Sequence, residues 1–116
     1  MPNMPEPMAG EIWDVVLDPQ VGREQAGYRP ALVISNDYFN QVDNGLHIIA
    51  PITSRNRGIR QHVSIVEPEG GIKGAAVIMC DQAKAQSTLR FRRRRGKVSD
   101  ELLKLVQQMV GESIDR

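Results

Sequence analysis

Short apolar runs rich in β-branched residues, each closed by glycine, proline or polar residues, are the feature that most limits what this chain can fold into. Such runs form strands, because they are too short and too rich in Ile and Val to favour helices. The sequence predicts strands over residues 11–18, 31–35, 46–53, 62–67 and 75–82. Short strands joined by glycine-rich turns favour a small, strongly curved antiparallel sheet or barrel.

The end of the chain follows a helical pattern instead. Ser99 is predicted to be an N-cap, and Asp100 and Glu101 stand in the first turn, where the helix dipole favours acids. Apolar residues then recur on one helix face: Leu102, Leu103, Val106, Met109, Val110 and Ile114. The predicted fold class is therefore mainly β, with a C-terminal α-helix packed on the sheet.

Three local predictions are less regular. Residues 36–41 are polar and are expected to carry a short helical turn. Pro51 lies near the end of a predicted strand and favours an edge strand or a bulge, since proline cannot donate to a ladder. Residues 83–97 are polar and basic, and their pattern predicts no single element.

The bulk properties are those of an ordinary water-soluble domain. A chain of 116 residues with 41% hydrophobic and 25% charged residues can bury a core, so we expect one domain over residues 10–116 after a disordered lead-in at 1–9. No apolar run approaches the roughly 20 residues that span a bilayer, which predicts a cytoplasmic protein without membrane contact. The single Cys80 is interpreted as a small buried hydrophobe.

The net charge is only +1, but its distribution is uneven. Six basic residues fall within residues 90–97: Arg90, Arg92, Arg93, Arg94, Arg95 and Lys97. Such a run is either a solvated strand or loop, or a surface that contacts a polyanion. The sequence alone leaves both interpretations open.

No motif typical of phosphate loops, zinc sites or serine hydrolases occurs, and His47 and His62 are each interpreted as ordinary strand residues. Pro30 disfavours the helical region for Arg29, which is therefore expected to be extended at the mouth of a strand. Polar segments holding Glu24 to Arg29, Thr53 and Asp81 border three strands. Strand ends meet at one rim of a small barrel, so an arginine, a hydroxyl and a carboxylate there would suit phosphodiester chemistry.

The segment GEIWDVVLDPQVGREQAGYRPALVIS resembles the start of the MazF/PemK (Kid) toxin family. The family pattern is G-[DE]-[IV]-[WY], an Asp-Pro pair, then G-x-E-Q-x-G-x-R-P and an apolar strand. The resemblance continues with PITS at 51–54, AAVIMCDQAK after a glycine-rich turn, the basic stretch that ends in GKVS, and the C-terminal helix, and so covers residues 10 to about 112. It implies an SH3-like small barrel of the CcdB/PemK type that works as a homodimer.

The implied activity is that of a toxin from a toxin–antitoxin pair. The toxin would be a metal-independent endoribonuclease without a cofactor, which cuts single-stranded mRNA at short sequences. Its implied partner is an antitoxin with a disordered, acidic C-terminal segment that would fold across the active face and block it. The basic run from Arg90 to Arg95 could serve either RNA or this antitoxin segment. The strongest alternative is a non-catalytic, CcdB-like toxin that binds DNA gyrase, but that branch depends on a Trp near its C-terminus, and Trp13 is the only Trp here.

Carried over residue by residue, the family's catalytic Arg falls on Arg29 and its catalytic Thr or Ser on Thr53. The acid–base partner is expected to be Glu24 or Asp81. The Kid-like branch, in which the Asp is catalytic, also has an Arg two residues before that Asp and a His in the x of G-x-E-Q. This chain has Met79 and Arg23 at those positions, so the choice between the two carboxylates stays open. Polar residues around these positions are expected to contact RNA: Gln25, Tyr28, Asn36, Ser54, Arg55, Arg57, Gln82 and Lys84.

Overall fold

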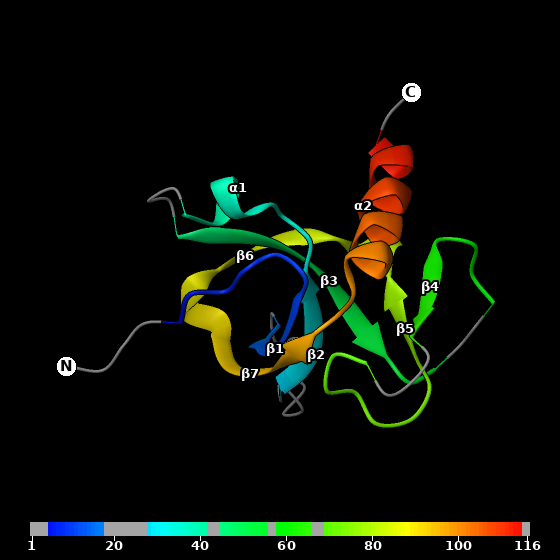
Figure 1. Ribbon diagram of the computed structural model, residues 1–116, viewed down its shortest axis with the longest axis horizontal. Coiled ribbons are helices and arrows are strands. Elements are labelled where there is room, and N and C mark those ends of the chain that lie inside the picture. The colour runs from blue at the N-terminus through cyan, green and yellow to red at the C-terminus, as the bar shows by residue number, and fades with distance from the viewer. Residues whose placement is uncertain (1–4, 18–27, 42–44, 56–57, 66–68, 115–116) are drawn as a thin grey trace, which may run out of the picture.

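The structure is a computed structural model that describes residues 5–17, 28–41, 45–55, 58–65 and 69–114 (Figure 1). Its strands are β1 (Glu11–Val16), β2 (Tyr28–Val33), β3 (Leu46–Thr53), β4 (His62–Ile65), β5 (Ala76–Met79), β6 (Lys84–Ser87) and β7 (Phe91–Lys97). The helices are α1 (Asp37–Gln41) and α2 (Asp100–Ile114), with 3₁₀ turns η1 (Cys80–Gln82) and η2 (Thr88–Arg90). Figure 1 shows α2 standing against one side of the strands.

All strands pair antiparallel in one sheet of order β4-β5-β3-β2-β1-β7, and β6 pairs with the first half of β3. The prediction of a mainly β fold with a C-terminal helix is confirmed. The predicted closure into a barrel is not observed, because within the described ranges β4 pairs only with β5 and β7 only with β1. A closed barrel needs its two edge strands to meet, and here they end the sheet.

Two of the differences between the observed and predicted strand bounds concern residues near the predicted site. Strand β2 begins at Tyr28, so that Arg29 and Pro30 are part of the strand that follows the loop. The extended conformation that proline imposes on Arg29 thus starts the ladder early. The run predicted as a strand over 75–82 stays extended only to Met79, and Cys80–Gln82 then form a 3₁₀ turn.

The interpretation of Pro51 as a marker of an edge strand is wrong, because β3 is central. Its ladder with β6 ends at Ile49, and its ladder with β5 begins at Ile52. Pro51 lies between the two ladders while it faces Ala31 of β2 on the other side. The missing N–H therefore falls where β3 changes partner, which is a position that tolerates proline in a central strand.

Alternating residues of the central strands feed two apolar clusters. Leu32, Ala50 and Ile52 join the larger one, which Val106 of α2 completes. Ala31, Val33 and Ile49 point to the opposite face. There they pack with Trp13 and Phe91, whose rings meet edge to face with centroids 5.8 Å apart. This alternation fixes which side chains of β2 and β3 share a face.

Helix α2 begins as the sequence predicts. The Ser99 hydroxyl accepts the N–H of Leu102 at 3.1 Å, which is the N-cap bond. Val106 is fully buried, and Leu102, Leu103, Met109 and Val110 pack against the larger cluster. Burial of this stripe holds the helix on the sheet.

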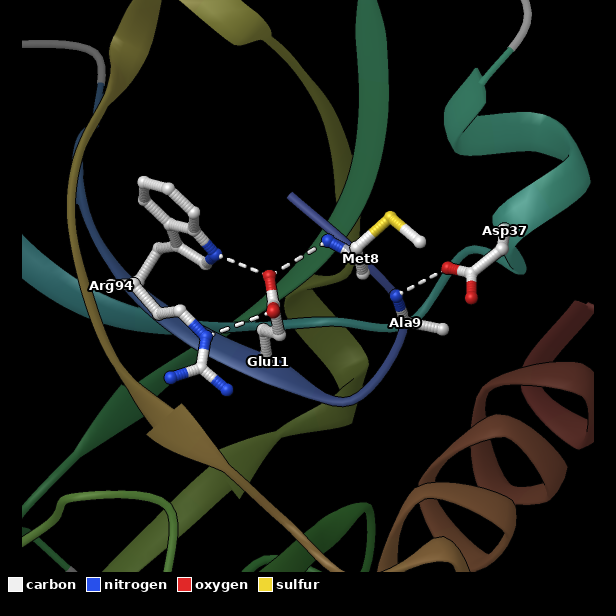
Figure 2. A network of polar contacts seen from close by, with 6 residues as sticks. Met8, Ala9, Glu11, Asp37 and Arg94 are labelled. Atoms are coloured by element: carbon white, nitrogen blue, oxygen red, sulfur yellow. Dashed lines mark hydrogen bonds and ion pairs between the residues drawn. The ribbon is translucent and has the colours of Figure 1, made fainter. Parts of the chain in front are cut away.

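The residues before β1 are tied down by two acids, as Figure 2 shows. Glu11 Oε1 accepts the backbone N–H of Met8 and the indole N–H of Trp13, each at 2.9 Å, and Arg94 Nε donates to Oε2 at 2.8 Å. Burial alone would raise the pKa of Glu11, but these hydrogen bonds together hold it below its ordinary value near 4.5. Asp37 Oδ1 accepts the Ala9 N–H at 2.7 Å. At the described end of the predicted lead-in, Met8 and Ala9 are therefore hydrogen-bonded and Pro7 is buried.

His47 is a buried member of a polar network rather than a ligand. Its Nδ1 lies 3.0 Å from Asn40 Oδ1 and its Nε2 lies 2.9 Å from Thr88 Oγ1. Because an amide oxygen only accepts, Nδ1 carries the proton and Nε2 accepts from Thr88. The neutral ring thus connects α1 to η2 across β3, and burial lowers its pKa below the ordinary value near 6.5.

This burial predicts an acid-sensitive step in stability. The pKa of His47 is lower in the folded protein than in the unfolded chain. As the pH falls below about 6.5, the unfolded chain therefore takes up a proton before the folded protein does. The stability that is present above about pH 6.5 is lost as the pH falls further, through the folded pKa. The slope is at most about 1.4 kcal/mol per pH unit. Urea unfolding of wild type and His47→Gln at pH 7.5 and 5.5 tests this, with the smaller pH dependence expected in the variant. Equal pH dependence of the two proteins would contradict it.

Candidate active site

Arg29 and Thr53 lie on adjacent strands, near the start of β2 and at the end of β3. The β2–β3 ladder pairs Val33 with Ile49 and Ala31 with Pro51, so each residue lies two positions beyond the last pair of the antiparallel ladder, on the same side of it. Both side chains line the same two hollows in the surface. The sheet therefore brings together the two residues that the family resemblance marks as catalytic.

The Arg29–Thr53 pair borders two hollows in the surface. The larger, of about 1010 Å³, is lined in addition by Tyr28, Ser54, Lys73, Arg93, Arg94 and Arg95, and is called the basic hollow below. The smaller, of about 290 Å³, is lined in addition by Arg55, His62, Met79, Gln82 and Lys84. A chain of phosphates that crosses from one hollow to the other would thus pass over Arg29 and Thr53.

The hydroxyl oxygen of Thr53 accepts one hydrogen bond within the protein. Its Oγ1 accepts the backbone N–H of Arg55 at 3.2 Å, as in a turn cap. A hydroxyl that accepts one hydrogen bond still has its own proton to donate. Thr53 can therefore be both a local cap and a donor to a bound anion.

Arg29 differs from the arginines of β7 in its partners. Asp14 offsets Arg93 at 3.4 Å and Arg95 at 3.0 Å, although the Arg95 N–H is not aimed at the carboxylate as a hydrogen bond requires. In the part of the chain that the structure describes, no acid pairs with Arg29, whose side chain is exposed. Its planar guanidinium has the geometry to bind two phosphate oxygens.

Most of the basic run forms β7 at the edge of the sheet, while Arg90 ends the turn η2, and several of its arginines have partners within the protein. Besides the pairs with Asp14, Arg94 bonds Glu11, and Arg92 Nη1 donates to the carbonyl of Leu89 at 2.6 Å. The side chain of Arg93 is nevertheless 70% exposed and that of Arg94 48%. Exposed ion pairs are weak, so these guanidinium groups can also bind an anionic ligand in the basic hollow.

Asp81 lies in η1 and pairs with a residue that sequence reasoning set aside. Its Oδ1 is 3.0 Å from Nε2 of His62, the first residue of β4. The alternation of HVSI was the available signal, because it turns His62 away from the buried Val63 and Ile65. The preceding Cys80 is buried, and burial with a further effect of Asp81 raises its pKa to about 11, which fits an inert thiol.

The other predicted contacts divide into three groups. Tyr28 and Ser54 line the basic hollow, while Arg55, Gln82 and Lys84 line the smaller one. Asn36 lines neither: its side chain accepts the Phe39 N–H at 2.8 Å at the start of α1, where it borders an apolar groove beside α2. Glu24, Gln25 and Arg57 lie outside the described residues.

Residues 8–114 match the PemK-like, MazF-like toxins of type II toxin–antitoxin systems. This chain belongs to that family. Endoribonuclease PemK of Escherichia coli is 39% identical over 89 residues, which are 76% of this chain and 64% of that protein. Endoribonuclease MazF9 of Mycobacterium tuberculosis is 33% identical over 108 residues, which are 83% of this chain and 92% of that protein.

Solved structures of the family agree in fold. MazF of Deinococcus radiodurans superposes with a TM-score of 0.78 at 29% identity, covering 95% of this chain and 97% of that one. MazF in a MazE–MazF structure from the same organism gives a TM-score of 0.73 at 25% identity, with 94% and 95% covered. The predicted family resemblance and endoribonuclease class are confirmed by these matches. None of the described helices is long and apolar enough to cross a membrane.

Proposed function

We propose that the Arg29–Thr53 pair is the centre of a metal-independent endoribonuclease site that cuts single-stranded mRNA. The observation that carries this proposal is that an exposed arginine, which pairs with no acid among the described residues, lines the same two hollows as a hydroxyl donor on the adjacent strand. Phosphodiester cleavage needs such groups, because negative charge builds up on the phosphate oxygens in the transition state.

The reaction uses the RNA's own nucleophile. The ribose 2′-oxygen attacks the adjacent phosphorus while the 5′-oxygen leaves, which gives a 2′,3′-cyclic phosphate and a 5′-hydroxyl end. Arg29 neutralises a non-bridging oxygen, since a guanidinium is not deprotonated in proteins. Thr53 donates a further hydrogen bond, and Glu24 or Asp81 takes the proton of the 2′-hydroxyl. DNA has no 2′-hydroxyl and is not cut.

RNA beyond the cut site follows the basic side chains. Lys73 and the exposed parts of Arg93 and Arg94 would hold phosphates in the basic hollow. Tyr28, 62% exposed at the mouth of that hollow, offers its ring to an unpaired base. Arg55 and Lys84 would hold the strand on the side of the smaller hollow.

The biological role that fits this activity is that of a toxin which blocks translation and is held inactive by a cognate antitoxin. Structures of related toxins include complexes with MazE. We place an acidic, initially disordered antitoxin segment on the same basic surface, where it would compete with RNA. A homodimer is proposed for the active toxin by analogy with the family.

The test uses purified protein with a long single-stranded RNA in excess EDTA, beside DNA of the same sequence. We expect RNA fragments with 5′-hydroxyl ends and intact DNA. Intact RNA across several unrelated sequences would overturn the proposal and favour a toxin that binds a protein. Cleavage that EDTA abolishes would overturn the metal-independent mechanism.

A further inference from the structure

We propose that His62 is a positioning residue for RNA cleavage, which holds Asp81 in the orientation that accepts the 2′-hydroxyl proton. The inference rests on the proposed function and assigns its acid–base group. It concerns two side chains that come from different strands and meet beside the smaller hollow.

The ladder of β4 and β5 puts His62 next to the site. His62 pairs with Met79, and Val63 and Ile65 point to the core on the other face. The hollow that His62 and Met79 line is also lined by Arg29 and Thr53. Asp81 follows two residues after Met79, and its neighbour Gln82 lines the same hollow. His62 thus lines the hollow that Arg29 and Thr53 share, and Asp81, which lines neither hollow itself, reaches this site through its contact with His62.

The geometry of the pair gives the two residues different tasks. The His62 side chain is 4% exposed, whereas that of Asp81 is 37% exposed. A carboxylate only accepts, so His62 donates from Nε2 to Oδ1 over 3.0 Å. The ring, whose side chain is almost fully buried, fixes one oxygen of an accessible carboxylate, and no described residue bonds Oδ2.

Packing alone does not explain a histidine at position 62, because of its second ring nitrogen, Nδ1. His62 Nδ1 is buried and has no hydrogen-bond partner among the described residues. An unsatisfied buried polar atom costs about 1–3 kcal/mol, which a hydrophobic side chain of similar size would avoid. The hydrogen bond from Nε2 to Asp81 explains why an imidazole is present here despite the unsatisfied Nδ1.

The proton balance of the step is complete without another reactant. Asp81 Oδ2 takes the 2′-hydroxyl proton as the 2′-oxygen bonds to phosphorus and the bond from phosphorus to the 5′-oxygen breaks. The leaving 5′-oxygen takes a proton from solvent water, and Asp81 later releases its proton to solvent. His62 remains bonded to Oδ1 throughout, so its contribution is orientation.

Two amide variants of His62 that differ in side-chain length separate the positioning of Asp81 from packing. In His62→Gln the side-chain amide can extend to the place of Nε2 and donate to Asp81, whereas the shorter amide of His62→Asn cannot. We expect His62→Gln to stay within about 3-fold of the wild-type kcat, and His62→Asn and His62→Leu to lose about 10- to 100-fold. KM for a short RNA should change little, because Arg29 and the basic hollow are untouched.

Asp81→Asn supplies the background for a double-mutant test. This variant should lose about 10²–10⁴-fold in kcat, and adding His62→Leu should cost nothing more. Urea unfolding of every variant checks the fold. Overturning results are wild-type kcat in folded His62→Leu, equal loss in His62→Gln and His62→Asn, or additive losses in the double variant. If wild-type protein cuts no RNA, the proposed function itself fails, and that result is distinct from these.

Discussion

Arg29→Ala is expected to lower kcat for RNA cleavage by about 10²- to 10³-fold, the usual cost of removing one preorganised group that stabilises transition-state charge. The reason is geometric: Arg29 lines both hollows together with Thr53, and it pairs with none of the described acids. Arg29→Lys should recover only part of the loss, since an ammonium carries the charge without the planar fork.

Lys104→Ala is the matched control for loss of one positive charge. Lys104 is exposed on α2 and lines neither hollow, so its removal should leave cleavage unchanged. Single-turnover rates on one short RNA measure all three variants. An Arg29→Ala protein that is folded and cleaves within about 3-fold of wild type would remove Arg29 from the proposed mechanism.

Gly96→Ala is expected to destabilise the fold by about 3 kcal/mol or more, the upper range for inserting a methyl group where none fits. A Cβ on Gly96 would lie 2.6 Å from the carbonyl carbon of Gly70, and one on Gly71 would lie 2.2 Å from the carbonyl oxygen of Arg95. Both contacts are with backbone, which cannot rotate away. This close approach packs the turn at Gly70 and Gly71 against β7. Lys73, which follows the turn, and the arginines of β7 form two walls of the basic hollow.

Gly111→Ala provides a control of opposite sign. Gly111 lies within α2, and a Cβ there meets nothing within 4 Å. Alanine is the better helix former, so this variant should be more stable by about 0.5–1 kcal/mol. Urea unfolding of both variants measures the difference. A Gly96→Ala protein within about 0.5 kcal/mol of wild type would show that the turn and β7 are not held this tightly.

The sequence predicts best what depends on neighbouring residues. Pro30, as a local constraint, was enough to place Arg29 in an extended segment beside an apolar run. The Ser99 cap and the apolar stripe of α2 follow from spacing alone and are confirmed. The roles that we propose for Arg29 and Thr53 come from the short family motifs in which the two residues lie.

What the sequence could not predict depends on which strands become neighbours. The His62–Asp81 contact requires the β4–β5 register, and nothing near either residue encodes it. The pairs of Arg93 and Arg95 with Asp14 likewise need β7 to lie beside β1. The interpretation of Pro51 failed because a proline can occupy a central strand where that strand changes partner.

The most direct test of the proposed mechanism is cleavage of an RNA that carries a single 2′-deoxynucleotide on the 5′ side of the mapped cut. The mechanism predicts that this bond resists the enzyme in excess EDTA, while the all-ribose RNA is cut there and leaves a 2′,3′-cyclic phosphate. Cleavage of the deoxy-substituted bond at the normal rate would mean that water attacks the phosphorus, and would contradict the mechanism.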